Sequence, residues 1–343
     1  MLNRINYIDI CKGLLIIIVI MVHIPNYART WCVSLSQNFS LIDYILQFIF
    51  ACFIMQAFFI LSGYTANFNK PFHSYFINLC KRILVPKFTL TIIWRIGDWI
   101  LADRHTLMTE MYGENYFFLF ECYWFLDALF IIKLVQYFLC KYIKNDIAHG
   151  FFWFIMLIMN IYINNYIYGD AKEPGHYLNY FHYRNAMGMG LYMWIGYYYK
   201  KHITSEKIIY ILGFLFIPLI IYPYFTGIFE PVQYSHSTSI TLIQIPKHIL
   251  FSICGSCAII SFSKLISKSF ILEYLGRNSL IIYCLHFPFL TYILIFINHI
   301  SIPLNTKFTI LIFVIILISS LFLCIISIQI LNAKKIKWII GKF

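Results

Sequence analysis

The chain has 343 residues, of which 61% are hydrophobic and only 12% are charged, with 26 Lys and Arg against 14 Asp and Glu and a net charge of +12. Soluble domains carry about 25% charged residues, so this composition excludes a soluble enzyme. The apolar runs are continuous, as in those that start at Leu14 and at Ile310, and this excludes the alternating pattern of a membrane β-barrel. The composition therefore predicts an all-α, polytopic membrane protein.

Ten apolar segments follow one another along the chain, with lengths close to that of a membrane-spanning helix. The sixth is short and rich in glycine between Met187 and Tyr199, so nine or eleven spans also fit. The gaps are too short for a separate soluble domain, and residues 1–343 are predicted to form one transmembrane domain of about ten helices. The segments lie near 10–28, 41–66, 83–101, 116–140, 151–169, 186–200, 208–224, 248–263, 279–297 and 308–331.

The basic residues are unequally distributed between the two sides of the predicted membrane. An even number of spans places both termini on one side, and that side carries seventeen basic residues against six on the other. Cytoplasmic loops are enriched in Lys and Arg, so both termini are predicted to lie in the cytoplasm. Topology thus explains the net positive charge without a nucleic-acid partner.

The first span carries His23 at a depth where ionisable groups are costly and rare. A neutral imidazole can transfer a proton near neutral pH, while a packing histidine bonded to a neighbouring helix carbonyl fits the position equally well. Asp9 lies on the same face of this helix but roughly 21 Å along its axis, too far for a direct contact.

The third span begins with a basic cluster formed by Lys81 and Arg82, and Lys87 follows just inside. Basic side chains at this depth hold lipid phosphate groups. They hold equally well the phosphates of a nucleotide-bearing cofactor that enters from the cytoplasm. Position alone does not separate these two ligands.

The fourth span contains Trp124 and Asp127 three positions apart, on one face of the predicted helix. Trp124 taken alone is typical of an interfacial anchor. Asp127 is a functional candidate, because a carboxylate within a span needs a partner. Lys133, Arg95 and His23 are the partners that the sequence suggests.

In the ninth span, Tyr283 and His286 lie three positions apart on one face, shortly after Asn278 and Ser279. Asn278 and Ser279 are suited to capping the helix. His286 lies about two turns into the membrane and is either functional or simply hydrogen-bonded.

The external loops are rich in aromatic and polar residues, which suit a platform for sugars but are also common at any membrane interface. They include Tyr177, Tyr180, His182, Tyr183 and residues 234–241. A metal cofactor is not expected, because the CxxC pair of Cys254 and Cys257 falls within a membrane helix.

Five segments, in order, resemble the acyltransferase 3 family of integral membrane acyltransferases, particularly the stand-alone type that O-acetylates cell-surface sugars. The similarity in order and spacing extends over nearly the whole chain. The segments are RINYIDICKGLLIIIVIMVH (4–23), QAFFILSGY (56–64), CKRILVPKF (80–88), YWFLDALF (123–130) and GRNSLIIYCLH (276–286).

The resemblance implies a ten-helix enzyme of the cytoplasmic (inner) membrane that moves an acyl group, usually acetyl from cytoplasmic acetyl-CoA, to a hydroxyl group of a glycan or lipid-linked sugar. The family's catalytic histidine matches His23, and its basic motif for CoA phosphates matches Arg82, with Lys81 beside it. Other matched or neighbouring residues take substrate or structural roles: Ser62, Tyr64, Trp124, Asn278, Ser279, Tyr283 and His286.

This chain departs from the family at Leu79, where many members carry a second arginine three residues before the one that matches Arg82. The ammonium group of Lys81 does not reproduce the bidentate phosphate binding of an arginine. In the implied mechanism, the CoA phosphates stay at this basic motif while the thioester approaches His23. His23 acts as a general base or carries the acyl group, and Asp127 orients it.

A transporter or flippase of a sugar or lipid-linked substrate is the alternative, because intramembrane His, Asp and Lys residues also mark transport pathways. The sequence shows no convincing internal repeat of the kind that transporters often contain. The resemblance favours an O-acetyltransferase whose partners are acyl-CoA, a sugar acceptor and membrane lipids.

Overall fold

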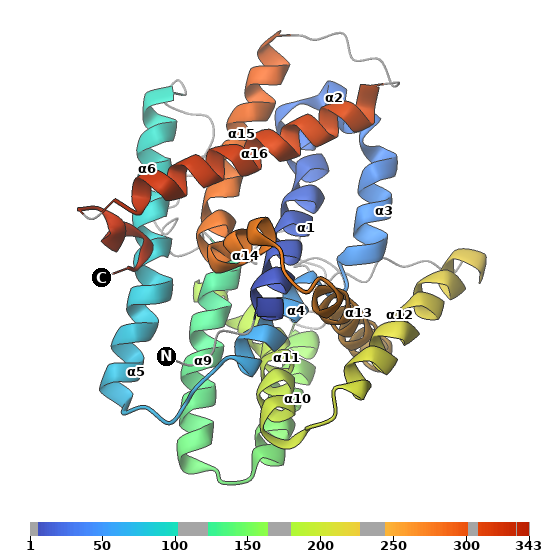
Figure 1. The fold of residues 1–343 in the computed structure, drawn as a ribbon, viewed down its shortest axis with the longest axis vertical. Helices are drawn as coiled ribbons and strands as arrows, with labels where there is room; N and C mark the ends of the chain where they lie inside the picture. The colour runs from blue at the N-terminus through green and yellow to red at the C-terminus, as the bar shows by residue number, and fades with distance from the viewer. Residues whose placement is uncertain are drawn as a thin grey trace. The chain divides into compact units, whose positions relative to one another are not determined.

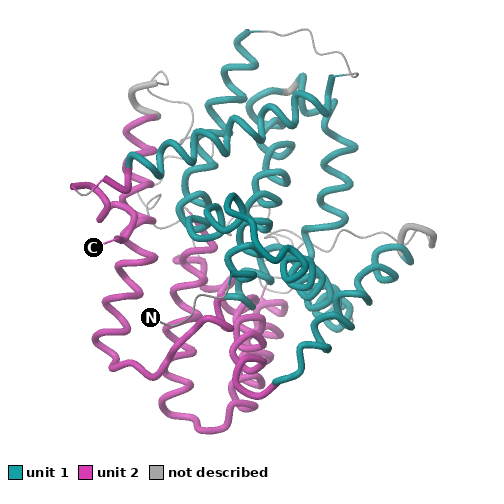
Figure 2. The backbone as a smooth tube through the Cα atoms, in the orientation of Figure 1, with its two compact units in different colours: residues 1–61, 204–238, 243–330 teal, residues 62–203, 239–242, 331–343 magenta. Residues whose placement is uncertain are grey.

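The computed structural model describes residues 6–101, 123–163, 180–226, 244–300, 308–333 and 335–342. Every regular element within these ranges is helical, as the composition predicts. The chain forms two compact units, each assembled from separate stretches of sequence (Figure 2). Unit 1 contains residues 1–61, 204–238 and 243–330, and unit 2 contains residues 62–203, 239–242 and 331–343.

Unit 1 is built around the long helix α1 (Asn6–Trp31), which packs against α13, α14 and α15 (Figure 1). Two glycines allow the backbones of α1 and α14 to touch. A methyl group at Gly13 would overlap the Leu272 carbonyl oxygen, and one at Gly276 would overlap that of Asp9. The other helices of this unit are α2 (Val33–Asn38), α3 (Ser40–Phe50), α4 (Ile54–Tyr64, whose last turn belongs to unit 2), α12 (Lys207–Thr226), α13 (Ile245–Leu265), α14 (Phe270–Arg277), α15 (Ser279–Ile300) and α16 (Thr309–Leu331).

Unit 2 is also helical, and its helices α9, α10 and α11 pack against one another. A buried polar network joins α9 and α10: Gln136 accepts a hydrogen bond from Trp153 Nε1 at 2.7 Å, and its amide nitrogen lies 3.1 Å from His149 Nδ1. Because the Ile143 carbonyl accepts from His149 Nε2 at 2.9 Å, both ring nitrogens are satisfied. The elements are α5 (Phe72–Leu79), η1 (Cys80–Leu84), α6 (Val85–Leu101), α9 (Trp124–Tyr142), α10 (Asp146–Tyr162), η3 (Tyr180–His182), α11 (Tyr183–His202) and η6 (Lys337–Ile340).

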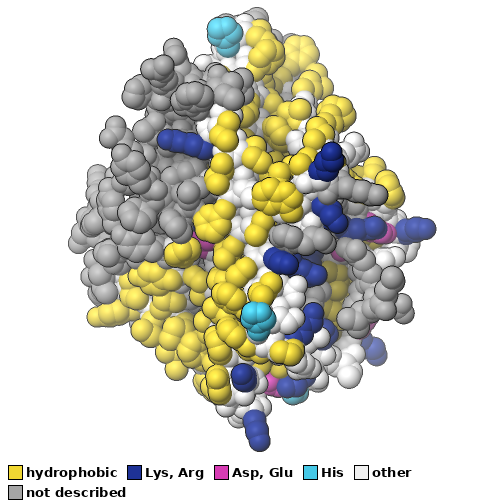
Figure 3. All heavy atoms as spheres, turned by 90° about the vertical axis from the view of Figure 1, so that its left-hand side faces the viewer, with side chains coloured by type: hydrophobic (Ala, Val, Ile, Leu, Met, Phe, Trp, Pro, Cys, Tyr) yellow, Lys and Arg dark blue, Asp and Glu magenta, His cyan; other side chains and the backbone are white. Residues whose placement is uncertain are grey.

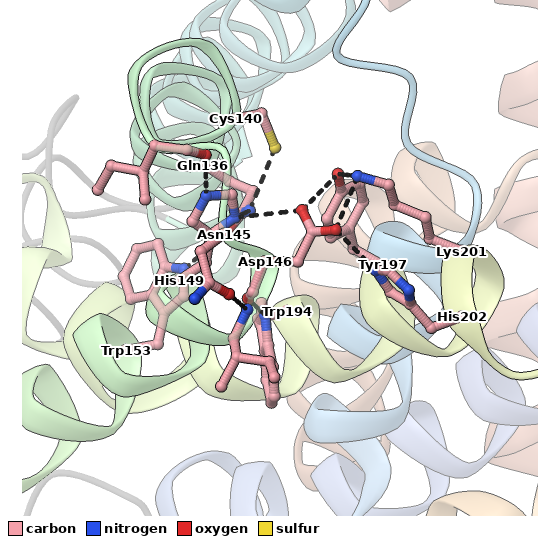
Figure 4. A network of polar contacts seen from close by, with 12 residues as sticks. Gln136, Cys140, Asn145, Asp146, His149, Trp153, Trp194, Tyr197, Lys201 and His202 are labelled. Carbon is pink, nitrogen blue, oxygen red and sulfur yellow. Dashed lines mark hydrogen bonds and ion pairs between the residues drawn. The ribbon is translucent and has the colours of Figure 1, made fainter.

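Asp146, at the start of α10 and before the predicted fifth span, ties this helix to the end of α11 (Figure 4). Its carboxylate accepts hydrogen bonds from Tyr197 at 3.2 Å and His202 at 2.6 Å, and Lys201 Nζ lies 2.7 Å away. Burial by itself raises the pKa of the Asp146 carboxyl, but hydrogen bonds from Lys201 and His202 outweigh burial and lower this pKa below its ordinary value.

Within the described ranges, five helical stretches are long and apolar enough to cross a membrane: Asn6–Trp31, Ser40–Tyr64, Ile245–Leu265, Ser279–Ile300 and Thr309–Leu331. Asp146–Tyr162 and Lys207–Tyr222 are shorter apolar helices. Each of the ten segments predicted from the sequence overlaps a described helix. The second segment is two helices, α3 and α4, joined by a turn at residues 51–53.

The apolar surface of these helices fits contact with lipid. On α16, Ile310, Ile318 and Phe322 expose 60% or more of their surface. Figure 3 shows many hydrophobic side chains exposed on one face. A soluble protein rarely exposes so large an apolar patch, so the structure is that of a membrane protein.

Candidate active site

Unit 1 brings together two histidines that are far apart in the sequence. The ring centroids of His23 on α1 and His286 on α15 lie 5.3 Å apart. Phe287 packs against both rings, at 5.1 Å from His23 and 4.4 Å from His286. Tyr27 lies 6.0 Å from His23, and Tyr283 lies 5.7 Å from His286. His23, which was predicted separately from the pair of Tyr283 and His286, therefore belongs to one cluster with them.

Each of these histidines stands two positions before a proline inside its helix, Pro25 in α1 and Pro288 in α15. A proline has no N–H group, so one carbonyl in the turn that contains each histidine loses its helical partner. Both helices are thus opened beside the histidine pair. The His-x-Pro pattern occurs in both segments and is a signal in the sequence that links His23 with His286.

The surroundings of His286 assign the proton on its ring. Nδ1 lies 3.2 Å from the Ile282 carbonyl oxygen, which can only accept, so Nδ1–H is the donor. The side chain is fully buried, and Nε2 has no hydrogen-bond partner among the described residues. An unsatisfied buried polar atom costs about 1–3 kcal/mol, and Nε2 is an acceptor that is open to a donor. His23 is half-buried.

Asn278 and Ser279 join α14 to α15. The Asn278 side chain donates to the Tyr274 carbonyl at 2.9 Å, and its own carbonyl accepts from the backbone N–H groups of Ile281 and Ile282. Ser279 is the first residue of α15. The Asn278 side chain therefore closes the end of α14, and its contacts are those of a structural residue.

Asp9 is held by a cation near the same helix junction. Arg277 pairs with Glu273 at 2.7 Å and with Asp9 at 3.6 Å. Asp9 thus has a charged partner other than His23, in keeping with the distance along α1 that the sequence implies.

In unit 2, Asp127 links a lysine and a histidine. Its Oδ1 accepts a hydrogen bond from Lys87 Nζ at 2.5 Å, and its Oδ2 accepts one from His182 Nδ1 at 2.9 Å. The side chains of Lys87 and Asp127 are fully buried, and that of His182 is 13% exposed. Neither Lys87 nor His182 was among the partners suggested by the sequence.

Backbone strain is concentrated around this group. Among the described residues, positive φ outside glycine occurs at Tyr123 (63°), Phe181 (52°) and His182 (50°). Such conformations cost on the order of 1–3 kcal/mol each and persist where contacts hold them. Tyr123 precedes the turn of α9 that contains Asp127, and the Phe181 ring lies 5.7 Å from Lys87 Nζ. The strained residues therefore surround the buried ion pair.

The basic residues Lys81 and Arg82 lie in η1, a π-helical turn between α5 and α6. Single π-helical turns are frequent at functional sites, because the extra residue breaks the regular helix pattern. Arg82 is exposed, whereas Leu79, one turn earlier, is only 7% exposed. The position that holds the second arginine in many relatives thus faces the protein interior here.

The remaining predicted residues of unit 2 have varied surroundings. Tyr64 lies 6.3 Å from Tyr199 and 5.9 Å from Lys200 Nζ, measured to ring centroids. Ser62 accepts a hydrogen bond from Thr65 through its backbone carbonyl at 3.4 Å. Trp124 begins α9 and is half-buried.

Parts of the predicted sugar platform, Tyr177 and residues 234–241, lie outside the described residues, as does the side chain of Tyr180. His182 is described and binds Asp127, a role that its loop position did not reveal. No group of three or more His, Cys, Asp or Glu side chains in the described parts of the chain is arranged to hold a metal ion.

Comparison with known families identifies the family of this chain. Residues 5–328 match a family described as an acyltransferase domain, and this range includes every predicted site residue. No curated protein and no solved structure matches the chain. Because the family match covers nearly the whole sequence of a membrane protein, the chain belongs to the acyltransferase 3 family of membrane acyltransferases.

Proposed function

We propose that this protein moves an acyl group, most simply acetyl, from cytoplasmic acyl-CoA to a hydroxyl group of a cell-surface glycan or lipid-linked sugar. The observation that carries this proposal is the contact between His23 and His286 in a chain of the acyltransferase 3 family. The enzyme would lie in the cytoplasmic membrane with both termini inside, an orientation favoured by its distribution of basic residues.

His23 supplies the proton transfer. It takes the proton of the acceptor hydroxyl while the hydroxyl oxygen attacks the thioester carbonyl carbon. The carbon–sulfur bond breaks, and the CoA thiolate takes the proton back from His23, so the imidazole ends neutral. A route through an acyl-imidazole uses the same residue as nucleophile and gives the same products.

His286 positions His23. Its Nδ1–H is committed to the Ile282 carbonyl, so its buried Nε2 can only accept. A hydrogen bond from one nitrogen of His23 to this acceptor would orient the other His23 nitrogen towards the acceptor hydroxyl. The same arrangement of a base and the group that orients it recurs in unrelated acyl-transfer enzymes.

We also assign Asp127 a positioning role, towards His182. Its two oxygens hold Lys87 and His182, so it fixes the ring orientation of His182 as carboxylates do for catalytic histidines. We assign to His182 a part in binding the sugar hydroxyl. Lys87 neutralises the buried carboxylate and lowers the cost of keeping it charged.

The proposal is tested with purified protein, by measuring thiol release from acetyl-CoA and acetyl transfer to added sugars. His23→Ala is expected to abolish both. His299→Ala removes an exposed histidine of α15 and serves as the matched control. A transporter would move a sugar substrate in vesicles without cleaving the thioester, and that result would overturn the proposal.

A further inference from the structure

The C-terminal segment of unit 2, residues 335–342, packs against the turn that carries the two basic residues of the donor site. The Thr89 hydroxyl of α6 donates to the Ile339 carbonyl at 2.7 Å, and Ile340 is only 4% exposed. The segment is therefore docked on α6 by both a hydrogen bond and apolar burial. It follows the part of the chain, residues 5–328, that matches the family.

Gly341 makes the closest contact of this segment with η1. Its φ is +71°, and a side chain there would meet the backbone of the Lys81–Arg82 peptide: a methyl carbon would overlap the Lys81 carbonyl oxygen and lie 3.3 Å from the Arg82 Cα. Only glycine combines this backbone conformation with so close an approach. Gly341 thus places the end of the chain directly on the basic turn.

The same turn brings two lysines of the segment together. Gly341 N–H binds the Trp338 carbonyl at 2.9 Å and Lys342 N–H binds the Lys337 carbonyl at 3.1 Å, a pattern that closes η6 as a helix end. The backbones of Lys337 and Lys342 are therefore adjacent, and Lys342 directly follows Gly341, the residue that touches η1. Four basic residues, Lys81, Arg82, Lys337 and Lys342, are gathered around one contact.

No Asp or Glu side chain lies close to this cluster in the sequence. The stretches 44–97 and 274–343 contain no Asp or Glu at all. Partial burial also lowers the pKa of Lys342, because the ammonium form loses hydration. The Lys342 ammonium donates a hydrogen bond to Asn332 Oδ1 at 2.7 Å. An anion bound at the cluster would compensate further for the lost hydration.

We infer that the C-terminal segment completes the phosphate-binding site for the acyl-CoA donor, with Lys342 and Lys337 supplying the positive charge that Leu79 does not. This inference rests on the proposed function, because it extends the donor site of that reaction. A CoA molecule carries three phosphate groups and a charge of about −4 near neutral pH. Lys81 and Arg82 of η1 carry two positive charges, which balance half of the charge on CoA. With Lys337 and Lys342 the cluster carries four, which balance all of it.

Three variants separate charge from docking. Lys342→Gln removes one charge and keeps the Gly341 contact. Gly341→Val keeps every charge but pushes the segment off η1. Lys144→Gln, at an exposed lysine in the loop between α9 and α10, is the matched control. Binding of CoA and of 3′-dephospho-CoA to the full-length protein in detergent is measured by calorimetry, at two salt concentrations.

Lys342→Gln and Gly341→Val are each expected to raise the Kd for CoA by roughly three- to tenfold, the effect of losing one charge-assisted contact. The salt dependence of binding should become shallower, and Lys144→Gln should bind like the unmodified protein. If Arg82→Gln weakens CoA binding while Lys342→Gln and Gly341→Val leave it unchanged, the inference is wrong and the proposed function stands. If the unmodified protein binds no CoA, the proposed function fails as well.

A lipid phosphate is the other source of the same chemistry. Native mass spectrometry of the protein with phosphatidylglycerol or phosphatidylcholine separates the two sources. If Lys342→Gln reduces retention of phosphatidylglycerol without changing the Kd for CoA, the cluster is a lipid site and the inference is overturned. Competition in which CoA displaces phosphatidylglycerol only when Gly341 is intact would support the inference.

Discussion

His23 and His286 are 263 positions apart in the sequence, yet their ring centroids lie 5.3 Å apart and each histidine precedes a proline by two positions. The prolines remove helical hydrogen bonds beside both rings. The Ile282 carbonyl fixes the proton of His286 on Nδ1. This pair therefore combines a histidine whose proton is fixed by the backbone with a second, half-buried histidine.

The role of His286 can be tested by separating turnover from donor binding. His286→Ala should lower kcat by about 10²-fold or more, the scale of a lost proton-transfer geometry, with the KM for acetyl-CoA nearly unchanged. His286→Asn keeps a short side chain with a donor and should retain more activity than the alanine variant. Steady-state thiol release provides the measurement. An equal rise in KM for both variants would assign His286 to donor binding instead.

The buried Lys87–Asp127 pair should be far more important for stability than an exposed one. Asp127→Ala leaves the Lys87 ammonium buried without this partner and is expected to cost about 3–5 kcal/mol. The Arg29–Asp43 pair, whose arginine is 61% exposed, is the control, and Asp43→Ala should cost no more than about 1 kcal/mol. Unfolding in detergent measures both. Equal losses would show that burial does not set the strength of the Lys87–Asp127 pair.

The Asp146 network should make part of the stability depend on pH. The pKa of the Asp146 carboxyl is lower in the folded protein than in the unfolded chain. The stability that this carboxylate contributes is therefore fully present above its unfolded pKa, and it is lost as the pH falls through its folded pKa. Lowering the pH from about 6 to about 3 should therefore destabilise the unmodified protein more than Asp146→Asn. Thermal unfolding at each pH provides the comparison, and parallel curves for the two proteins would contradict it.

The contact between α1 and α14 should not tolerate a side chain. Gly276→Ala places a methyl group against the Asp9 carbonyl, where only backbone can give way, and should cost about 1–3 kcal/mol. Gly188→Ala meets only the Asn160 side chain, at 3.1 Å, and should cost less. Unfolding of the two variants under identical conditions measures the difference. A larger loss for Gly188→Ala would show that this helix contact is looser than the structure indicates.

The orientation of the chain can be tested by labelling engineered cysteines from outside intact cells. The native Cys32 is a poor reporter because it is only 1% exposed. Ser34→Cys lies at an exposed position of α2, and Lys144→Cys lies at an exposed position of the α9–α10 loop. With both termini inside, the first should react and the second should react only after the membrane is opened. The reverse pattern would invert the topology.

Much of the helical framework could be predicted because its cause is local. Continuous apolar runs in a chain with few charges form helices wherever backbone groups must be satisfied without water. All ten predicted segments accordingly overlap described helices. The cost of an ionisable group in a span also singled out His23, Asp127 and His286 one by one.

The pairing of these residues could not be predicted, because it depends on which helices pack together. The sequence suggested several cationic side chains as partners of Asp127. Its partners in the structure, Lys87 and His182, lie 40 and 55 positions away. Nothing in the local sequence shows that Phe181 and His182 adopt positive φ to reach this carboxylate.

The sequence by itself determined that this is a helical membrane protein, and it determined which few polar residues are candidates, since the membrane makes every such residue costly. Only the tertiary structure decided that His23 meets His286, that Leu79 is buried, and that Gly341 lies on the basic turn. These relationships are contacts between distant segments. They follow from side-chain packing and close backbone approach, which no single segment encodes.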